Sequence, residues 1–281
     1  MIHSDWHIHT DASYDAKLPI ETLIQRAQEQ GLRRFGVTDH ANFNDEKFLG
    51  DLRRSAQSVQ THQAQCPSMV SGVELTPIEK PLFDYITKTG TREGYVPVIQ
   101  DTPYGIELAA TKEYLMSLGV RYAIGAAHWR VDVPDRNNAD NSLSVVIREW
   151  FRQQMYLACD ERVTILGHPW WHGTGLWYED FSAIPQSMNE ELAAALLENH
   201  KYAEMNAHFL ISRKTSDKFR YQYAEFMRFL FEKGIPITYG SDCHGGEDQD
   251  YPDMRPRLEK YLSAVGFRDG DFSEIAEEDL W

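Results

Sequence analysis

The chain has 281 residues and a formal net charge of −15 at pH 7, from 28 Lys and Arg against 43 Asp and Glu. An anionic exterior repels a phosphate backbone, so we expect no nucleic acid as a stable partner, although bound cations could make one pocket locally positive. The length suits one large domain, which we expect to span 1–281.

Cysteine spacing and hydropathy bear on where the protein works. Cys66, Cys159 and Cys243 are widely separated and form no CxxC pair, which favours a reduced, cytoplasmic setting. No apolar run reaches the length of a membrane span, and Met1 leads into a polar strand and not into a signal sequence. We therefore expect a soluble cytoplasmic protein without a membrane partner.

Segments that fit strands alternate along the chain with segments that fit helices. At 19–31, for example, an amphipathic pattern has a proline at its start and a glycine at its end, which is typical of a helix. Strands are predicted over 2–9, 33–40, 68–75, 121–129, 163–171, 201–209 and 235–244, and helices over 19–31, 46–65, 105–118, 143–159, 190–199, 219–233 and 256–265.

The alternation breaks at 77–102, which is rich in Thr, Gly, Pro and aromatic residues. A long connection of this kind in a compact domain is often a lid or a binding loop. A peripheral hairpin without a catalytic role is the alternative, and both interpretations stay open at this stage.

About seven strand–helix repeats predict an α/β fold with a parallel sheet and crossover helices. Closure of the sheet into a barrel would allow side chains from every strand to meet. The active sites of such barrels lie at the carboxyl ends of the strands.

The predicted strand ends repeatedly carry residues that bind metals. His7 and His9 are two positions apart on a strand, so both imidazoles can face one side and hold one ion. HxH alone is a weak signal, but the pattern recurs. Mixed imidazole and carboxylate ligands suit Zn²⁺, Mn²⁺ or Fe²⁺ better than Ca²⁺. The other metal-binding residue types at strand ends are His40, Glu74, His128, His168, Asp242 and His244.

The ordered set of these motifs resembles the polymerase and histidinol phosphatase (PHP) family. The set consists of HxH, TDH at 38–40, GVE at 72–74, two isolated histidines and SDxH at 241–244. Amidohydrolases also begin with HxH on a barrel strand, but they do not typically add an early TDH and a terminal Asp-x-His. The resemblance implies a distorted, TIM-like (β/α)7 barrel with a trinuclear metal centre at the carboxyl ends of its strands.

The resemblance also implies three divalent ions, Zn, Mn or Fe, and a set of ligands for each. Some relatives have His in place of Asp15, which could alter the metal preference. The first ion would be held by His7, His9, Glu74 and Asp242, the second by Glu74, His128 and His168, and the third by Asp15, His40 and His244.

A metal cluster of this kind suits phosphoryl transfer. A carboxylate shared by two ions forms a bridge, and a water between the ions is acidified toward a pKa of about 7, which gives hydroxide at neutral pH. The ions also neutralise charge on the phosphoryl oxygens. We therefore assign Glu74 and Asp242 to catalysis as well as to metal binding.

Candidates for the proton donor and the substrate contacts are weaker. His172 and His208 lie just past strand ends, so either could protonate the leaving oxygen. Arg130 is a candidate for a bidentate phosphate contact, with a solvated role as the alternative. Further candidates at the rim are Arg213 and Lys214 for phosphate, Asn206, which matches a Glu-x-Asn motif at the pocket in relatives, and the aromatic group Trp129, Trp170, Trp171, Trp177 and Tyr178, which either stacks on substrate or only covers the barrel rim.

Three neighbouring side chains have supporting interpretations. Asp39 directly precedes His40 and should face away from its ion, so we expect it to hydrogen-bond to an imidazole. Glu204 is interpreted as a structural carboxylate, and Cys243 as a packed thiol.

The leading hypothesis is a metal-dependent phosphoesterase that hydrolyses a small phosphomonoester, with histidinol phosphate, a nucleotide or a sugar phosphate as candidates. One alternative is an amidohydrolase-like enzyme that cleaves an amide or a lactone. A carboxylated lysine usually accompanies that chemistry, and no lysine falls at a predicted strand end. The other alternative is a non-catalytic, metal-binding regulatory module.

Overall fold

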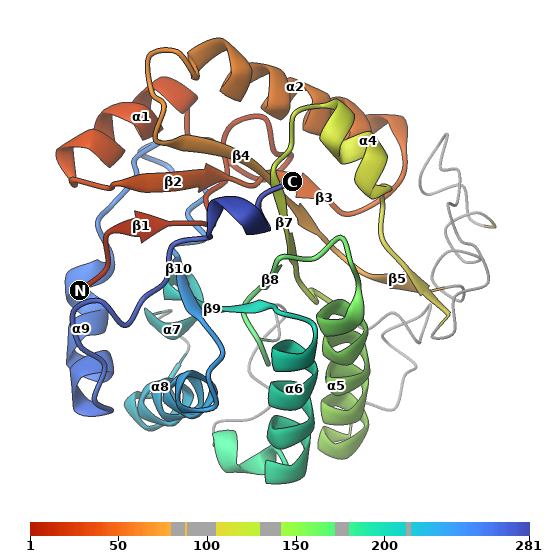
Figure 1. The fold of residues 1–281 in the computed structure, drawn as a ribbon, viewed down its shortest axis with the longest axis vertical. Coiled ribbons are helices and arrows are strands. Elements are labelled where there is room, and N and C mark those ends of the chain that lie inside the picture. The colour runs from red at the N-terminus through yellow and green to blue at the C-terminus, as the bar shows by residue number, and fades with distance from the viewer. Residues whose placement is uncertain (80–87, 89–104, 130–141, 172–179, 212–214) are drawn as a thin grey trace.

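A parallel sheet curls into a barrel, and helices surround it (Figure 1). The computed structural model describes residues 1–79, 88, 105–129, 142–171, 180–211 and 215–281. Within these ranges, seven strands follow one another around the barrel with every neighbouring pair parallel, so the predicted α/β barrel is confirmed. In spatial order they are β1 (Ser4–Asp5), β2 (Arg34–Val37), β4 (Met69–Leu75), β7 (Tyr122–Gly125), β8 (Ile165–Leu166), β9 (Tyr202–Asn206) and β10 (Ile237–Gly240).

The segments that follow β1 and β10 close the barrel against each other. Ile8 forms a parallel bridge with Cys243. The backbone N–H of His9 donates to the Cys243 carbonyl at 3.0 Å, and that of Asp242 donates to the His7 carbonyl at 2.7 Å. Residues from the two ends of the sequence therefore share one rim. Beyond β2, the short strand β3 (His40–Ala41) pairs with β4 at the same rim.

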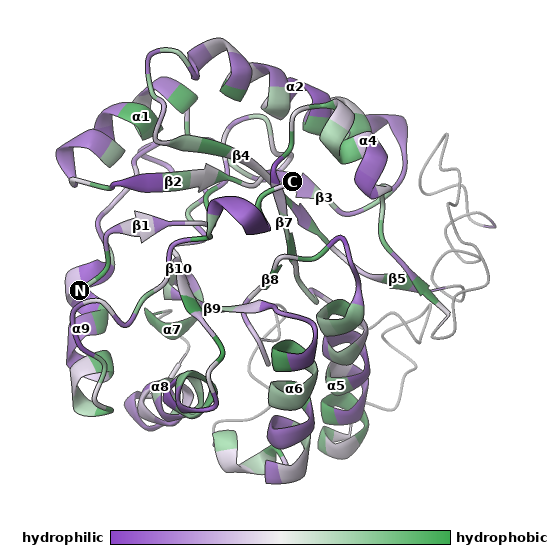
Figure 2. Cartoon of the chain, viewed as in Figure 1, coloured by the Kyte–Doolittle hydropathy of each residue, from purple (hydrophilic) through white to green (hydrophobic). Residues whose placement is uncertain are grey.

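The helices form the outer layer, and their hydropathy explains why. Figure 2 shows hydrophobic and hydrophilic residues interleaved along them, as expected for helices with one face on a core. Among the described residues, none of the helices combines the length and the apolar character needed to cross a membrane. They are α1 (Ile20–Glu29), α2 (Glu46–His62), α4 (Lys112–Ser117), α5 (Leu143–Cys159), α6 (Gln186–Glu198), α7 (Ala207–Ile211), α8 (Asp217–Glu232) and α9 (Arg255–Ala264), with 3₁₀ turns at Phe181–Ala183 and Glu277–Asp279.

Most predicted strands are shorter in the structure, and several predicted helices are shifted by a few residues. Two of the differences have a clear side-chain cause. The helix predicted over 105–118 begins only at Lys112, because the Thr111 hydroxyl caps it by accepting the Tyr114 N–H. The strand predicted over 201–209 ends at Asn206, whose side-chain oxygen accepts the Phe209 N–H at 2.8 Å and starts α7. In both places a polar side chain that accepts a backbone N–H marks the start of a helix.

The ends of the long 77–102 connection meet in a two-stranded antiparallel pair outside the barrel. This pair consists of β5 (Ile78–Glu79) and β6 (Ile106–Glu107). Residues 80–87 and 89–104 lie outside the described residues, so the prediction of a lid or a hairpin stays a prediction.

Tyr122 fills the space between the first strands of the barrel. Its ring is fully buried and lies edge-on to Trp6, at a centroid distance of 5.6 Å. Its hydroxyl donates to the Trp6 carbonyl at 2.7 Å. A Cβ atom at Gly36 would lie 1.7 Å from the Tyr122 hydroxyl oxygen, and one at Gly72 would lie 2.6 Å from its ring. The absence of side chains at Gly36 and Gly72 therefore leaves the space that the Tyr122 ring occupies.

This packing predicts that Gly36→Ala lowers the free energy of unfolding by about 1–3 kcal/mol, because the added methyl forces Tyr122 out of its position. Gly50→Ala is the matched control, since a Cβ at Gly50 in α2 would meet only the tip of Arg53 at 3.8 Å. We expect the control to be stabilised by roughly 0.5–1 kcal/mol through helix propensity. Urea unfolding of both variants measures the difference, and a Gly36→Ala protein as stable as the wild type would contradict the packing argument.

Candidate metal centre

All nine side chains predicted as metal ligands meet at the carboxyl-terminal rim of the barrel. They arrive on different strands because parallel strands end at the same edge. His40 lies in β3 and Glu74 in β4, and the others follow strand ends or lie in the first loop. Three overlapping groups of these side chains have ligand atoms within 4.8 Å of one another: His9, His40 and His244; His7, His9 and Asp242; and His40, Glu74 and His128.

Glu74 lies at the middle of the centre and is fully buried. Its Oε1 atom is 3.2 Å from Nε2 of His128 and 3.1 Å from Nε2 of His168. Its Oε2 atom is 3.3 Å from Nε2 of both His7 and His9 and 2.8 Å from Nδ1 of His40. The two oxygens of one carboxylate thus face two different sets of imidazoles, which is the arrangement of a bridging ligand.

Asp242 completes the group around His7 and His9. Its Oδ1 atom is 3.6 Å from Nε2 of His7 and 3.3 Å from Nε2 of His9. The two Nε2 atoms are 3.1 Å apart. With Oε2 of Glu74, four potential ligand atoms therefore surround one small volume, and they are the four expected for the first ion.

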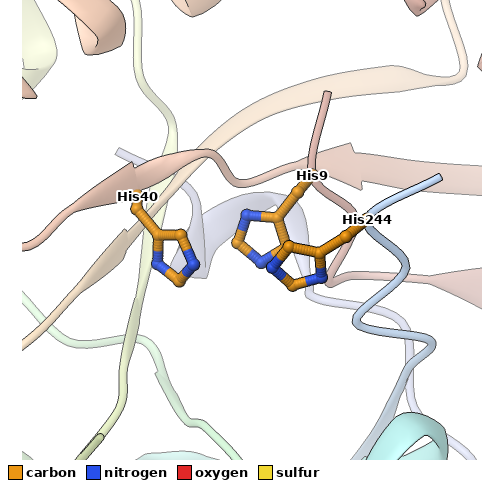
Figure 3. A group of neighbouring side chains, drawn as sticks. All are labelled: His9, His40 and His244. Atoms are coloured by element: carbon orange, nitrogen blue, oxygen red, sulfur yellow. The ribbon is translucent and has the colours of Figure 1, made fainter. Parts of the chain in front are cut away.

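A third group lies nearer to solvent. Oδ2 of Asp15 is 3.4 Å from Nε2 of His40 and 3.8 Å from Nε2 of His244. His9 lies between the two histidines, with its ring centroid 4.3 Å from His40 and 4.1 Å from His244 (Figure 3). The side chains of Asp15 and His244 are 32% and 30% exposed, whereas that of Glu74 is 0% exposed. This group is therefore the most accessible of the three.

The donor set fits divalent cations. Oε2 of Glu74 is buried and has no well-aligned hydrogen-bond donor among the described residues, although Nδ1 of His40 lies 2.8 Å away. An unsatisfied buried carboxylate oxygen is costly, and a cation at this position would offset that cost. Imidazole nitrogens mixed with carboxylate oxygens are the ligands that Zn²⁺, Mn²⁺ and Fe²⁺ accept. The number and identity of the ions remain predictions.

Hydrogen bonds on the far side of two imidazoles turn their Nε2 atoms toward the centre. Nδ1 of His128 is 2.9 Å from the Thr76 hydroxyl, which donates to Oδ1 of Asn42. Because that hydroxyl has one proton to donate, Nδ1 of His128 is the donor to it. Nδ1 of His244 donates to the backbone carbonyl of Asp242 at 3.0 Å. Both rings then present an Nε2 lone pair, as a metal ligand requires.

The charges of the centre shift one another's protonation. Burial alone would raise the pKa of Glu74, but the neighbouring His7, His128 and His40 hold the pKa of this carboxyl well below its usual range. Burial alone would lower the pKa of His40, yet Glu74 and Asp15 raise it to about 10. Burial and the nearby His9 lower the pKa of His244 to about 4. The rim is thus a densely coupled set of acids and imidazoles.

The backbone is strained at two of the predicted ligands. His168 has φ 25° and Asp242 has φ 53°, in a region that residues other than glycine rarely adopt. Such conformations persist where the surrounding structure imposes them, typically at functional sites.

The structure corrects two predicted side chains. Within the described part of the chain, Asp39 does not hydrogen-bond to an imidazole: its oxygens accept from the Thr10 N–H and hydroxyl and from the Ser55 hydroxyl, at 2.6–2.7 Å. Asp39 therefore anchors the loop after His9. Trp170 is fully buried, and its indole N–H donates to Asn189, so it belongs to the core and not to the rim.

Trp171 and Trp129 both lie beside the centre. The Trp171 ring is 4.5 Å from His168 and 5.9 Å from His128, and it packs against the main core. The Trp129 ring is 5.7 Å from His128, stacks on Phe43 at 5.7 Å and packs against a small buried apolar cluster. Both rings therefore adjoin ligands of the predicted second ion, and both also have structural partners.

His208, Asn206 and Cys243 occupy different depths of the rim. His208 is exposed on α7, and its ring centroid is 6.5 Å from that of His244. Asn206 is buried and donates to Oδ2 of Asp242 at 3.2 Å. Cys243 is buried, as a packed thiol should be. Other predicted contacts lie outside the described residues: Arg130, His172, Arg213, Lys214, Trp177 and Tyr178.

Sequence reasoning overlooked the side chains that support the ligands. Thr76 and Asn42, which orient His128, had no predicted role. Glu204 was assigned to structure alone, yet its Oε1 atom lies 2.7 Å from Nδ1 of His7. A signal was available for Glu204, because a residue two positions before Asn206 on a strand faces the same side.

Comparisons with known proteins agree with this architecture. The crystal structure of histidinol phosphate phosphatase from Lactococcus lactis subsp. lactis Il1403, complexed with zinc, L-histidinol and phosphate, has a TM-score of 0.59 and 18% sequence identity, covering 95% of this chain and 94% of that chain. A probable histidinol-phosphatase from Thermotoga maritima is 33% identical over 48 residues, which are 17% of this chain and 21% of that relative. The model of the PHP domain matches residues 5–266. Since this match spans most of the sequence, the chain belongs to the PHP domain family.

Proposed function

We propose that this protein is a metal-dependent phosphoesterase that hydrolyses a small phosphomonoester with up to three divalent ions at the rim of its barrel. The single observation that carries the proposal is the buried carboxylate of Glu74, whose two oxygens face separate sets of imidazoles. Oε2 faces His7, His9 and His40, and Oε1 faces His128 and His168. Family membership supports the proposal, and so does the similar fold of a phosphatase that was crystallised with zinc, L-histidinol and phosphate.

Each proposed ion has its own group of protein ligands. His7, His9 and Asp242 would hold one ion, His128 and His168 the second, and Asp15, His40 and His244 the third, with Glu74 between the first two. Divalent ions bound there would supply an acidified water as the nucleophile and neutralise charge on the phosphoryl oxygens. Arg130, Arg213 and Asn206 stay predictions as phosphate or pocket contacts.

Trp171 supports a substrate with a planar or apolar leaving group. Its ring adjoins His168 and is 6.3 Å from Phe209, so an aromatic wall borders the position of the second ion. A base or an imidazole can stack on such a surface, and a sugar can pack on it. Histidinol phosphate, nucleotides and sugar phosphates therefore all remain candidate substrates, with Trp171 and Trp129 as the predicted contacts.

The amidohydrolase-like alternative receives no support from the buried Lys201. This lysine lies before β9, at the amino-terminal end of the barrel, where it donates to the carbonyls of Asp160 and Val163. A non-catalytic metal-binding module would share the ligands, and only turnover separates it from an enzyme.

The first prediction concerns activity and metal content together. With Mn²⁺ or Zn²⁺ added, the wild type should release phosphate from a panel of monoesters, whereas Asp242→Asn and His9→Ala should lose activity and at least one bound ion. Asn tolerates the positive φ of position 242, so this variant tests the ligand and not the backbone. Colorimetric phosphate assays and elemental analysis measure both properties. Lack of turnover by a metal-loaded wild type on every monoester would contradict the proposal.

A second prediction tests His208 as the proton donor to the leaving oxygen. His208→Gln should lower kcat about 100-fold for an alkyl phosphate, which needs a protonated leaving group, and much less for p-nitrophenyl phosphate. Metal content should not change, because His208 is outside the three ligand groups. His3→Gln is the control, since His3 binds Asp269 on the exterior. An equal loss on both substrates would argue against proton donation.

A third prediction follows from the pKa of His40, which its neighbouring carboxylates raise to about 10. In the metal-free protein this imidazole holds a proton at neutral pH, and an ion must displace it. Metal affinity should therefore rise between pH 6 and pH 8, with net release of protons. Isothermal titration calorimetry in two buffers of different ionisation enthalpy measures that release. If the metal affinity did not depend on pH, metal binding would not displace a proton from His40, and this prediction would be wrong.

A further inference from the structure

Glu204 connects side chains and backbone that serve two of the proposed ions. It is buried in β9. Its Oε1 atom accepts a hydrogen bond from Nδ1 of His7 at 2.7 Å. Its Oε2 atom accepts from the backbone N–H of His168 at 2.6 Å and from the side-chain amide of Asn206 at 3.2 Å. One carboxylate thus contacts a residue of the first ligand group and a residue of the second.

Asn206 extends this network to a third ligand. Its amide nitrogen also donates to Oδ2 of Asp242 at 3.2 Å, so both of its N–H bonds are used. Its oxygen accepts the Phe209 N–H at the start of α7, which fixes the orientation of the amide. His7, His168 and Asp242 are therefore joined through a single pair of side chains on β9.

The chemistry of the carboxylate determines which nitrogen of His7 carries the proton. An ionised carboxylate accepts hydrogen bonds and donates none, so Nδ1 of His7 must be the donor. The neutral ring then has its lone pair on Nε2, the atom that faces His9, Glu74 and Asp242. The opposite tautomer would place a proton where an ion has to bind.

Gly240 makes room for this pair. A Cβ atom at position 240 would lie 1.8 Å from Oε1 of Glu204 and 2.7 Å from Cβ of His7. The residue on the neighbouring strand thus leaves open the space in which the carboxylate reaches the imidazole. The glycine at position 240 is therefore a second, steric reason why Glu204 can contact His7.

We infer that Glu204 is a positioning residue that holds His7 in the metal-binding tautomer and fixes the backbone of His168, so that the first and second ions depend on the same side chain. This inference rests on the proposed function, because it presupposes the metal centre. His168 has a strained φ of 25°, and the hydrogen bond from its N–H to Glu204 stabilises that conformation.

Glu204→Gln tests the inference with almost no change of shape. The glutamine oxygen is needed as the acceptor for the His168 and Asn206 N–H groups, so its NH₂ group would face Nδ1 of His7. Two donors would then oppose each other unless the His7 proton moves to Nε2, which blocks metal binding. We expect the first and second ions to bind about 10–100-fold more weakly, while the ion at Asp15, His40 and His244 keeps its affinity.

The measurements are zinc titration against a competing chelator, elemental analysis and ¹H–¹⁵N NMR of the imidazoles. In the zinc-loaded wild type, His7 should show a protonated Nδ1 that exchanges slowly with water, and a His7 metallated through Nδ1 would overturn the inference without any variant. Glu107→Gln is the matched control, because Glu107 is a buried carboxylate paired with Arg162 away from the rim. The control should keep wild-type zinc affinities.

The outcomes separate the inference from the function on which it rests. A wild type that binds no ion would refute the proposed function. A wild type that binds zinc, together with a Glu204→Gln variant of unchanged affinity for the first and second ions, would refute only the role of Glu204. Equal weakening of all ions, accompanied by a lower unfolding midpoint, would also count against it, because a general loss of structure would then explain the effect.

Discussion

The burial of the Glu74 carboxylate among imidazoles is the constraint on which the rest of the rim depends. A charged oxygen without a well-aligned hydrogen-bond donor is costly inside a protein. Among the described residues Oε2 of Glu74 is in this position, and the imidazoles around it stabilise its charge only when they are protonated or bind a cation. In the metal-free protein, protonated histidines such as His40 supply this charge, as its raised pKa indicates. Divalent cations would supply this positive charge more effectively. The same ions would therefore stabilise the buried carboxylate and provide the chemistry of the site.

Closure of the barrel brings the ligands from the two ends of the chain together. The hydrogen bonds between the segments after β1 and β10 hold His7 and His9 against Asp242, although more than 230 positions separate them in the chain. The backbone is strained at the ligands His168 and Asp242. Glu204 accepts a hydrogen bond from the His168 N–H, and Asn206 donates one to the Asp242 carboxylate. Precision at the rim therefore comes from side chains that do not themselves face an ion.

The fold was largely predictable from the sequence, and the failures have identifiable causes. Periodicity located α5 without error and most other elements within a few residues, because amphipathic helices and short apolar strands leave a local signal. The predicted bounds were wrong where a side chain binds the backbone. Helix α4 starts later than predicted because Thr111 caps it, and β9 ends earlier than predicted because Asn206 starts α7. Asp39 was misjudged because alternation along a strand gives the direction of a side chain and not its partner, which proved to be the Thr10 loop.

The sequence by itself determined which residue types arrive at the strand ends, and in what order, since spacing of two along a strand and regular strand–helix alternation are local properties. It therefore indicated the barrel, the family and the candidate ligands. Only the tertiary structure decided which atoms face one another: that Glu74 divides its oxygens between two groups, that Glu204 faces His7, and that Trp170 is core whereas Trp171 adjoins the centre. These pairings join residues far apart in the chain, and their distances depend on how strands pack, which no local pattern encodes.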